Sequence, residues 1–355
     1  MDNGRYFDHA ATTPLNPDVL AEMMPYLQGV GNAHSLHSFG RRAEQAVALA
    51  RERLAHVLGA EDPGEITFTS GATESNAWAL SNFARVKASP FEHSSIADAI
   101  ASGSGTFLSN SGYALGPSDP SCDLIAVMAV SNETGAILDC PARPPHAAWL
   151  CDLTQALGKI DLEAPKFDMA SLSAHKIGGP LGVGALWNRT GLALQPLISG
   201  GGQELGQRSG TLNVPGIVGL GAAAILAQDN LESRSSAAQQ ARGIILEEIA
   251  SLEGWQCLDA PRQSPFILAL AWDGLAAQPI LEALDSEGFA ISSGAACSSR
   301  EAGPSRTARA LELPPKNRSG VIRISFFGNN HAETANLLAI ALGKAIKSLR
   351  SLGRE

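Results

Sequence analysis

Apolar positions in the first part of the chain follow the periodicities of amphipathic helices and of a buried strand. Apolar residues recur at helical spacing over 16–28 and 39–58, and Gly59 ends the second stretch. A β-rich run follows at 65–69 and passes through a serine and a glycine into a helical pattern over 72–87. The pattern therefore predicts two helices followed by a strand–turn–helix unit.

Short apolar runs in the middle of the chain have the character of buried strands. They are bounded by turn residues and lie at 124–130, 148–152, 167–173 and 182–187. Runs that are apolar on both faces are typical of a mostly parallel sheet covered by helices, so we predict an α/β fold. The link 131–147 contains three prolines, so a full covering helix is not expected there and one face should be thinly covered.

The pattern changes in the last third of the chain. Helices are predicted over 214–229 and 234–252, followed by a strand at 266–272, a helix at 278–287, strands at 289–292 and 321–326, and a final helix at 331–350. This order predicts a second, smaller α+β domain. We expect residues 13–233 to form the large domain, and residues 1–12 together with 234–355 to form the small one.

Length and charge narrow the classes of function. The chain has 355 residues, enough for two ordinary domains with a large core. Its 26 Lys and Arg against 35 Asp and Glu give a net charge of −9, and no run of like charge stands out. Nucleic acid and anionic lipid are therefore not expected as partners. Charged residues make up only 17% of the chain and Gly is abundant, which suits a tightly packed, oligomeric α/β protein.

The start of the chain, its apolar runs and its cysteines indicate the compartment and the kinds of site to expect. The chain starts with a polar, acidic stretch that does not resemble a signal peptide. The longest uncharged apolar run, 214–227, is shorter than the ~20 residues that cross a bilayer. We therefore expect a cytoplasmic protein that does not bind membranes. The five cysteines are odd in number and form no C-x-x-C, which argues against a disulfide framework and a structural zinc site, and no metal is expected.

Residues that could bind a ligand or take part in catalysis occur where predicted strands end. The turn ITFTSGATE at 66–74 places a glycine and hydroxyl groups at a helix start, which binds phosphate well, although an ordinary capped helix explains it equally. Asp152 follows a buried strand at the edge where open α/β sheets bind ligands, although a lone Asp there is more often a helix cap. Lys176 is one of seven lysines and ends an apolar strand. Unless it reaches the surface from a loop, such a lysine suits an imine or a bound phosphate.

Eleven short motifs occur in the order in which one known family carries them. They are YFDHAATTP (6–14), GNAHSLH (31–37), FTSGATESN (68–76), EHS (92–94), NETG (132–135), DLTQ (152–155), SAHK (173–176), GGGQE (200–204), RSGT (208–211), SSGAAC (292–297) and IRIS (322–325). On these motifs the chain resembles the class V aminotransferase family of fold type I pyridoxal phosphate (PLP) enzymes, and within it the cysteine desulfurases of the NifS/IscS type. Each motif is weak alone, but eleven in order cover nearly the whole chain. The resemblance implies a large PLP-binding domain with a mostly parallel sheet and a small α+β domain that carries the catalytic cysteine loop.

The resemblance assigns cofactor roles to residues of several motifs. Lys176 would be the lysine that binds PLP covalently, and His93 would stack on the pyridine ring. Asp152 would pair with the pyridinium nitrogen, and Gln155 would donate to the phenolic oxygen. A carboxylate beside this nitrogen keeps it protonated, which the cofactor needs to act as an electron sink. The residues assigned to the phosphate are Ala72, Thr73, Ser173, His175 and, from a second subunit, Thr211, so the resemblance implies a homodimer.

Further residues are assigned to the substrate. Asn132 and Arg323 resemble a substrate clamp, with Arg323 holding the α-carboxylate through a bidentate pair that lysine does not reproduce. Asn32 and His37 resemble residues near the same pocket. Taken alone, His93 is more simply a surface histidine and Arg323 a member of a surface ion pair.

The resemblance implies that L-cysteine is converted to L-alanine. Lys176 would move the α-proton, and Cys297 would take the sulfur as a persulfide for an acceptor protein such as an iron–sulfur scaffold, or for thiolation. Cys297 lies among small residues, which predicts an exposed loop rather than core. This thiol favours desulfuration, because transamination needs none. A selenocysteine lyase, another class V reaction and a catalytically silent PLP-fold accessory subunit stay open as alternatives.

Overall fold

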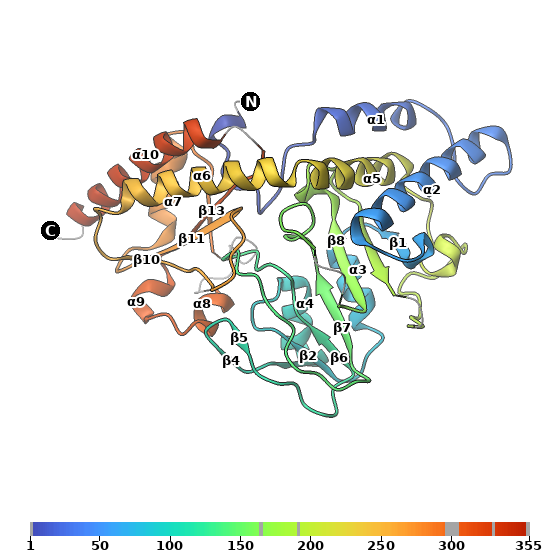
Figure 1. Cartoon of the computed structure of the whole chain (residues 1–355), viewed down its shortest axis with the longest axis horizontal. Coiled ribbons are helices and arrows are strands. Elements are labelled where there is room, and N and C mark those ends of the chain that lie inside the picture. The colour runs from blue at the N-terminus through green and yellow to red at the C-terminus, as the bar shows by residue number, and fades with distance from the viewer. Residues whose placement is uncertain (1–2, 163–165, 190–191, 295–304, 329–330, 353–355) are drawn as a thin grey trace.

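The protein forms two sheets, each packed against its own helices (Figure 1). The computed structural model describes residues 3–162, 166–189, 192–294, 305–328 and 331–352. Both chain ends lie on the side of the smaller sheet (Figure 1). Within the described residues, no single helix is long and apolar enough to span a membrane, although the bent pair α5 and α6 (Val214–Asp229 and Leu231–Ile249) passes on length and composition together.

The larger sheet has seven strands in the order β1-β9-β8-β7-β6-β2-β3. Its strands are β1 (Ile66–Thr69), β2 (Val86–Ala88), β3 (Gly105–Phe107), β6 (Leu124–Ala126), β7 (Ala148–Asp152), β8 (Met169–Ser173) and β9 (Gly184–Asn188). Strand β9 pairs antiparallel with β1 and β8, and all other pairings are parallel. The predicted α/β fold with a mostly parallel sheet is confirmed.

Helices cover both faces of this sheet at strand β8. At β6, Ile125 packs with residues outside helices such as Leu108 and Leu138, so the cover is thinner there, as the link 131–147 predicts. The helices are α1 (Pro17–Leu27), α2 (Ser38–Leu58), α3 (Ala72–Leu80), α4 (Ser94–Ala99) and α5. Side chains alternate across strand β8, so Leu172 packs with α2 and α5 while Met169 packs with α3 and α4. A small hairpin, β4 (Asn110–Ser111) and β5 (Ala114–Leu115), lies beside the sheet.

The smaller sheet is antiparallel and has four strands in the order β10-β11-β13-β12. Its strands are β10 (Trp255–Cys257), β11 (Ile267–Trp272), β12 (Ser292–Ser293) and β13 (Val321–Ser325). Its helices are α6, α7 (Ala277–Ser286), α8 (Arg306–Ala310), α9 (Pro315–Arg318) and α10 (His331–Leu352). The amino-terminal segment joins this unit, because Phe7 is fully buried in its core and Asp8 pairs with Ser325 through a β-bridge.

Several predicted elements have different boundaries in the structure. The helix expected over 72–87 ends at Leu80, because Ser81 and Asn82 bond to the Trp78 carbonyl through their side chains, and strand β2 follows. The strand expected over 124–130 ends at Ala126, although most of the residues after it stay buried. The strand expected over 289–292 is β12 instead. The link between β6 and β7 contains no helix, as its prolines predict.

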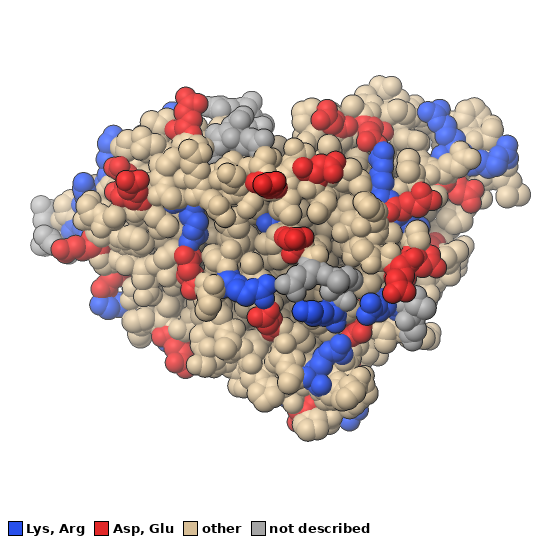
Figure 2. Space-filling model, in the orientation of Figure 1, with Lys and Arg blue, Asp and Glu red and all other residues tan. Residues whose placement is uncertain are grey.

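Lysine and arginine side chains are interspersed with aspartate and glutamate on the face shown in Figure 2. Charged side chains of the described residues form surface pairs, for example Arg85 with Asp123 at 2.6 Å and Arg262 with Asp139 at 2.6 Å. Exposed pairs of this kind add little to stability. The face therefore shows no extended surface of one sign.

Candidate active site

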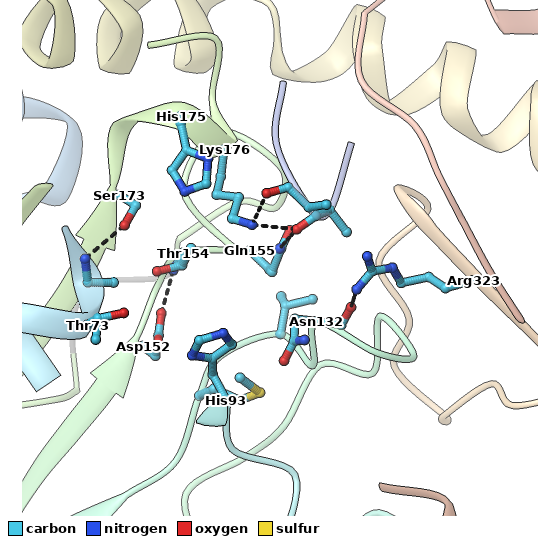
Figure 3. Close-up of a pocket in the computed structure, with 15 residues that line it drawn as sticks. Thr73, His93, Asn132, Asp152, Thr154, Gln155, Ser173, His175, Lys176 and Arg323 are labelled. Carbon is cyan, nitrogen blue, oxygen red and sulfur yellow. Dashed lines mark hydrogen bonds between the residues drawn. The ribbon is translucent and has the colours of Figure 1, made fainter. Parts of the chain in front are cut away.

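A cavity of about 310 Å³ opens where the carboxyl ends of β7 and β8 meet strand β13 of the smaller sheet. It is lined by Ala10, Ala11, Ala72, Thr73, His93, Met128, Val130, Asn132, Asp152, Thr154, Gln155, Ser173, His175, Lys176 and Arg323. In Figure 3, Thr73 and Arg323 lie at opposite ends, and Lys176 lies across the space from His93. This volume lies within the range of small-molecule sites, roughly 300–1,000 Å³.

The start of helix α3 forms one end of the cavity. Gly71 precedes the helix, and a Cβ on Gly184 of strand β9 would lie 2.6 Å from the Gly71 Cα, so only glycine allows this close approach. The Ala72 N–H donates to the Ser173 hydroxyl at 2.8 Å. Free N–H groups of a first helical turn, together with the hydroxyls of Thr73 and Ser173, make a site for an anion such as phosphate.

Asp152 lies at the carboxyl end of strand β7 and is 4% exposed. Its Oδ2 accepts a hydrogen bond from Asn76 Nδ2 at 3.0 Å, and its Oδ1 accepts from the Thr154 N–H at 2.8 Å. The hydroxyl of Thr154 is buried and has no hydrogen-bond partner in the part of the chain that the structure describes. The carboxylate is therefore held rigidly at the cavity wall, with a polar group beside it.

Lys176 ends the 3-10 turn Ala174–Lys176 that follows strand β8. Its Nζ donates to the carbonyl oxygens of Ala10 at 2.7 Å and Ala11 at 2.5 Å. Both carbonyls belong to the amino-terminal segment, so this segment determines where the amine lies. A lysine amine at a cavity wall can react with an aldehyde or accept a proton.

Two titratable groups next to the cavity have strongly shifted pKa values. Burial first, and then the neighbouring lysines Lys176 and Lys159, lower the pKa of His175 to about 4, so its ring is neutral at pH 7. Its Nδ1 lies 3.0 Å from the Thr12 hydroxyl. Burial first, and then Asp152, raise the pKa of Glu92 to about 8. Glu92 is therefore protonated at pH 7.

His93 is the N-cap residue of helix α4. Its Nδ1 accepts a hydrogen bond from the Ser95 N–H at 3.1 Å, which assigns the ring proton to Nε2. The ring is held at the cavity on the side opposite Lys176 (Figure 3). An aromatic ring in this place can stack on a planar ligand.

Arg323 forms the other end of the cavity. It is 2% exposed, and it donates to the Asn132 carbonyl and to Asp8 Oδ1, each at 2.8 Å. Asp8 is itself held by the Ser292 hydroxyl at 3.1 Å. The Arg323 Nε has no hydrogen-bond partner among the described residues. A buried guanidinium with an unused donor suits a carboxylate ligand.

Three predicted site residues are not among those that line this cavity. His37 begins helix α2, where its Nδ1 accepts from the Gly40 N–H at 3.2 Å, and Asn32 accepts from the His34 N–H at 3.0 Å. Thr211, like these two, is exposed. In one chain, local hydrogen bonds hold Asn32 and His37 outside their own cavity, and their role near a substrate pocket stays a prediction. Cys297 lies outside the described residues.

Sequence reasoning assigned no role to several residues that hold the site. Asn76 follows Thr73 by three positions, so both lie on one face of α3, and this spacing was a usable signal. Asp8 lies in the first motif, but no local pattern connects it with Arg323, which is 315 residues away. Lys159 is 2% exposed, which sequence alone does not predict for a lysine.

Comparison with known proteins places this arrangement in a family. The sequence profile of the family described as Aminotransferase class-V matches residues 5–96 and 117–338. The chain belongs to the class V aminotransferase family. The unmatched residues 97–116 include the β4–β5 hairpin.

Relatives of this class V aminotransferase match over almost its whole length. A protein named cysteine desulfurase from Gluconacetobacter diazotrophicus is 34% identical over 99% of this chain and 95% of its own. One named cysteine desulfurase IscS from Clostridium botulinum is 32% identical over 99% of this chain and 96% of its own. A solved NifS-like protein aligns with a TM-score of 0.86 and 29% identity over 96% of this chain and 99% of its own. The solved complex of SspA with cysteine aligns at 0.74 and 29% identity, over 91% and 98%.

The family implies a PLP cofactor, and the residues of this cavity fit one. PLP needs an anion site for its phosphate, a lysine amine, an anionic partner for its ring nitrogen and a surface for its ring. The helix start at Ala72, Lys176, Asp152 and His93 offer these four features around one cavity.

Proposed function

We propose that this chain is a PLP-dependent cysteine desulfurase, which converts L-cysteine to L-alanine and keeps the sulfur on Cys297 as a persulfide. The observation that carries the proposal is the placement of Lys176, Asp152 and His93 around one cavity that ends at the buried Arg323. Full-length relatives named cysteine desulfurase support the choice of reaction.

The residues at one end of the cavity and along its walls would hold the cofactor. The first turn of α3, with Thr73 and Ser173, would bind its phosphate, and the neutral His175 would add an N–H donor. Lys176 would attach to it covalently, and Asp152 would keep its ring nitrogen protonated. When bound, PLP supplies an electron sink for the charge that develops at the substrate α-carbon.

The other end of the cavity would bind and orient L-cysteine. Arg323 would hold the α-carboxylate, with its charge partly balanced by Asp8 and with its Nε free for a further hydrogen bond. Asn132 lies beside it and would fix the substrate amino-acid group. The substrate would then lie between Arg323 and Lys176, whose amine would move the α-proton.

The sulfur transfer would be completed by Cys297. Its thiolate would attack the substrate sulfur, so that a sulfur–sulfur bond forms while the carbon–sulfur bond breaks, and the carbon skeleton takes up a proton to become alanine. The persulfide sulfur would pass to an acceptor protein such as an iron–sulfur scaffold. Transfer of ³⁵S from labelled L-cysteine to a purified scaffold protein tests this last step.

We also propose that the working enzyme is a homodimer with shared sites. The face that carries Asn32, His37 and Thr211 also exposes large apolar side chains, including Leu36 at 92% and Leu205 at 90%. Leu36 and Leu205 border one surface pocket, together with Leu212, the neighbour of Thr211. Such exposed apolar groups favour an interface, and a two-fold axis there would carry these polar residues to the partner's cavity.

The cofactor assignment is tested by Lys176→Ala. Wild-type protein incubated with PLP should be yellow, and reduction with borohydride should fix the cofactor to the peptide that contains Lys176. Lys176→Ala should lose this attachment and all alanine production from L-cysteine. Lys347→Ala, at an exposed position of α10, is the control and should behave as wild type. A colourless wild type that PLP does not reconstitute would leave only the silent accessory subunit.

A further inference from the structure

Lys159 is buried beside the cavity without lining it. Its side chain is 2% exposed, and its Nζ donates to Gln155 Oε1 at 2.6 Å. Gln155 lines the cavity and is 3% exposed. Lys159 therefore contacts the cavity only through another side chain. A buried lysine needs a specific partner, and among the described residues this amide oxygen is the partner it bonds.

The charged groups around Lys159 disfavour its protonated form. They are Lys176, Arg323 and Arg234, all of them cations. Burial first, and then these cations, lower the pKa of Lys159 well below its ordinary range. The amine donates a hydrogen bond to the Gln155 oxygen in either protonation state, and the neutral form does so without burying a charge. The lysine is thus suited to hold an amide, but not to balance an anion.

The hydrogen bonds of Gln155 determine which way its amide faces. Oε1 is taken by Lys159, and one Nε2 hydrogen goes to the Ala10 carbonyl at 2.9 Å, the same carbonyl that accepts from Lys176. A carbonyl only accepts, so the amide nitrogen must face Ala10 and the oxygen must face Lys159. One Nε2 hydrogen is left for a ligand in the cavity.

We infer that Lys159 is a positioning residue, which holds the Gln155 amide so that one N–H is available to an anionic oxygen of the bound cofactor. The inference rests on the proposed function, in which Gln155 donates to the phenolic oxygen of PLP. Without Lys159, the Gln155 oxygen would be buried without a donor, and the amide would gain freedom to turn.

The test compares PLP binding by wild type, Lys159→Met and Gln155→Met. Lys159→Met keeps the apolar stem and removes the donor, so PLP affinity, measured by titrating the visible band, should fall about tenfold. The pH midpoint of that band should rise by ~0.5–1 unit, because the phenolic oxygen keeps more negative charge. The double variant should match Gln155→Met alone, since Lys159 acts only through Gln155. Lys347→Met, an exposed lysine of α10, should match wild type.

Several outcomes overturn the inference. Wild-type affinity and an unchanged band midpoint in Lys159→Met would reduce Lys159 to a structural role, whatever happens to the unfolding temperature. Additive effects in the double variant would also contradict it. If Lys159→Met does not fold, Gln155→Met with ¹⁵N-labelled lysine must shift the signal of the Lys159 amine, and an unchanged signal overturns the inference. A wild type that binds no PLP would instead overturn the proposed function.

Discussion

At the scale of single residues, the cation and the carboxylate of the cavity lie in different places and have different hydrogen-bond partners. Arg323 is buried and paired with Asp8, whereas Asp152 is held by neutral donors from Asn76 and the Thr154 backbone. Burial first, and then the neighbouring Lys176, lower the pKa of His175 and keep its ring neutral at pH 7. The cavity thus offers a cation at one end and a carboxylate on its wall, which is the arrangement that a zwitterionic amino acid and a protonated ring require.

The shifted pKa of His175 predicts a pH dependence of stability. The pKa falls from 6.5 to about 4 on folding, so between these values only the unfolded chain takes up the proton, and stability is lost as the pH falls through this window. His175→Gln should lose less stability than wild type between pH 6.5 and 4 in urea unfolding of the cofactor-free protein. His56→Gln, at an exposed position of α2, should show the wild-type slope. An unchanged slope in His175→Gln would contradict the neutral assignment.

Sequence could identify the site residues whose place depends on a nearby strand end or helix start. Asp152 ends β7, Lys176 follows β8, and Thr73 lies in the first turn of α3, so the local pattern predicted where they lie, while their roles came from the family resemblance. It could not show that Lys159 is buried, because this depends on how distant segments pack. It also could not show that His37 lies outside the cavity of its own chain, since a motif does not record where its residues lie in the folded chain.

At the scale of elements, the apolar pattern predicts strands and helices better than their ends. The pattern stays apolar past Ala126, yet the regular strand ends there. The residues beyond it stay close to β7, because the Val127 and Ala129 N–H groups donate to the Leu150 and Asp152 carbonyls at 3.0 Å each. Helix α3 stops at Leu80, where side-chain hydrogen bonds to Trp78 replace helical ones. Periodicity reports burial, whereas the end of an element depends on backbone geometry and on hydrogen bonds that the apolar pattern does not record.

The contact between β9 and the turn before α3 predicts a sensitive glycine. A Cβ on Gly184 would lie 2.3 Å from the Leu172 carbonyl oxygen and 2.6 Å from the Gly71 Cα, both of them backbone atoms. Gly184→Ala should therefore cost about 1–3 kcal/mol of unfolding free energy and weaken PLP binding, because the phosphate turn must move. Gly243→Ala in helix α6 meets no neighbouring atom and should leave stability unchanged or raise it by up to about 1 kcal/mol. Equal effects of the two changes in denaturant unfolding would contradict this reading.

At the scale of the whole molecule, the predicted family and fold are confirmed, while the domain boundaries at residues 12–13 and 233–234 stay predictions. The sequence pattern did not predict that Leu36 and Leu205 are exposed on one face, because the chain brings these distant residues together only when it folds. The proposed dimer gives this face a partner, and it places the predicted residues Asn32, His37 and Thr211 near a second cavity.

Changing this face should break the assembly. Leu205→Asp puts a charge on a side chain that is 90% exposed in one chain, so the fold should persist while sedimentation shows a monomer with lower PLP occupancy. Leu337→Asp on helix α10, which is 48% exposed and lies with the smaller sheet, is the matched control and should stay dimeric. A wild type that sediments as a monomer with full PLP occupancy would contradict the shared sites.

The central claim is that Cys297 takes sulfur from L-cysteine, and mass spectrometry tests it most directly. Wild-type protein loaded with PLP and treated with L-cysteine without reductant should carry one additional sulfur on the peptide that contains Cys297. Cys297→Ala should still bind PLP and L-cysteine, because Lys176, Asp152 and Arg323 are intact, but it should form neither alanine nor persulfide. Full alanine production by Cys297→Ala, or a wild-type peptide without added sulfur while alanine accumulates, would contradict the account.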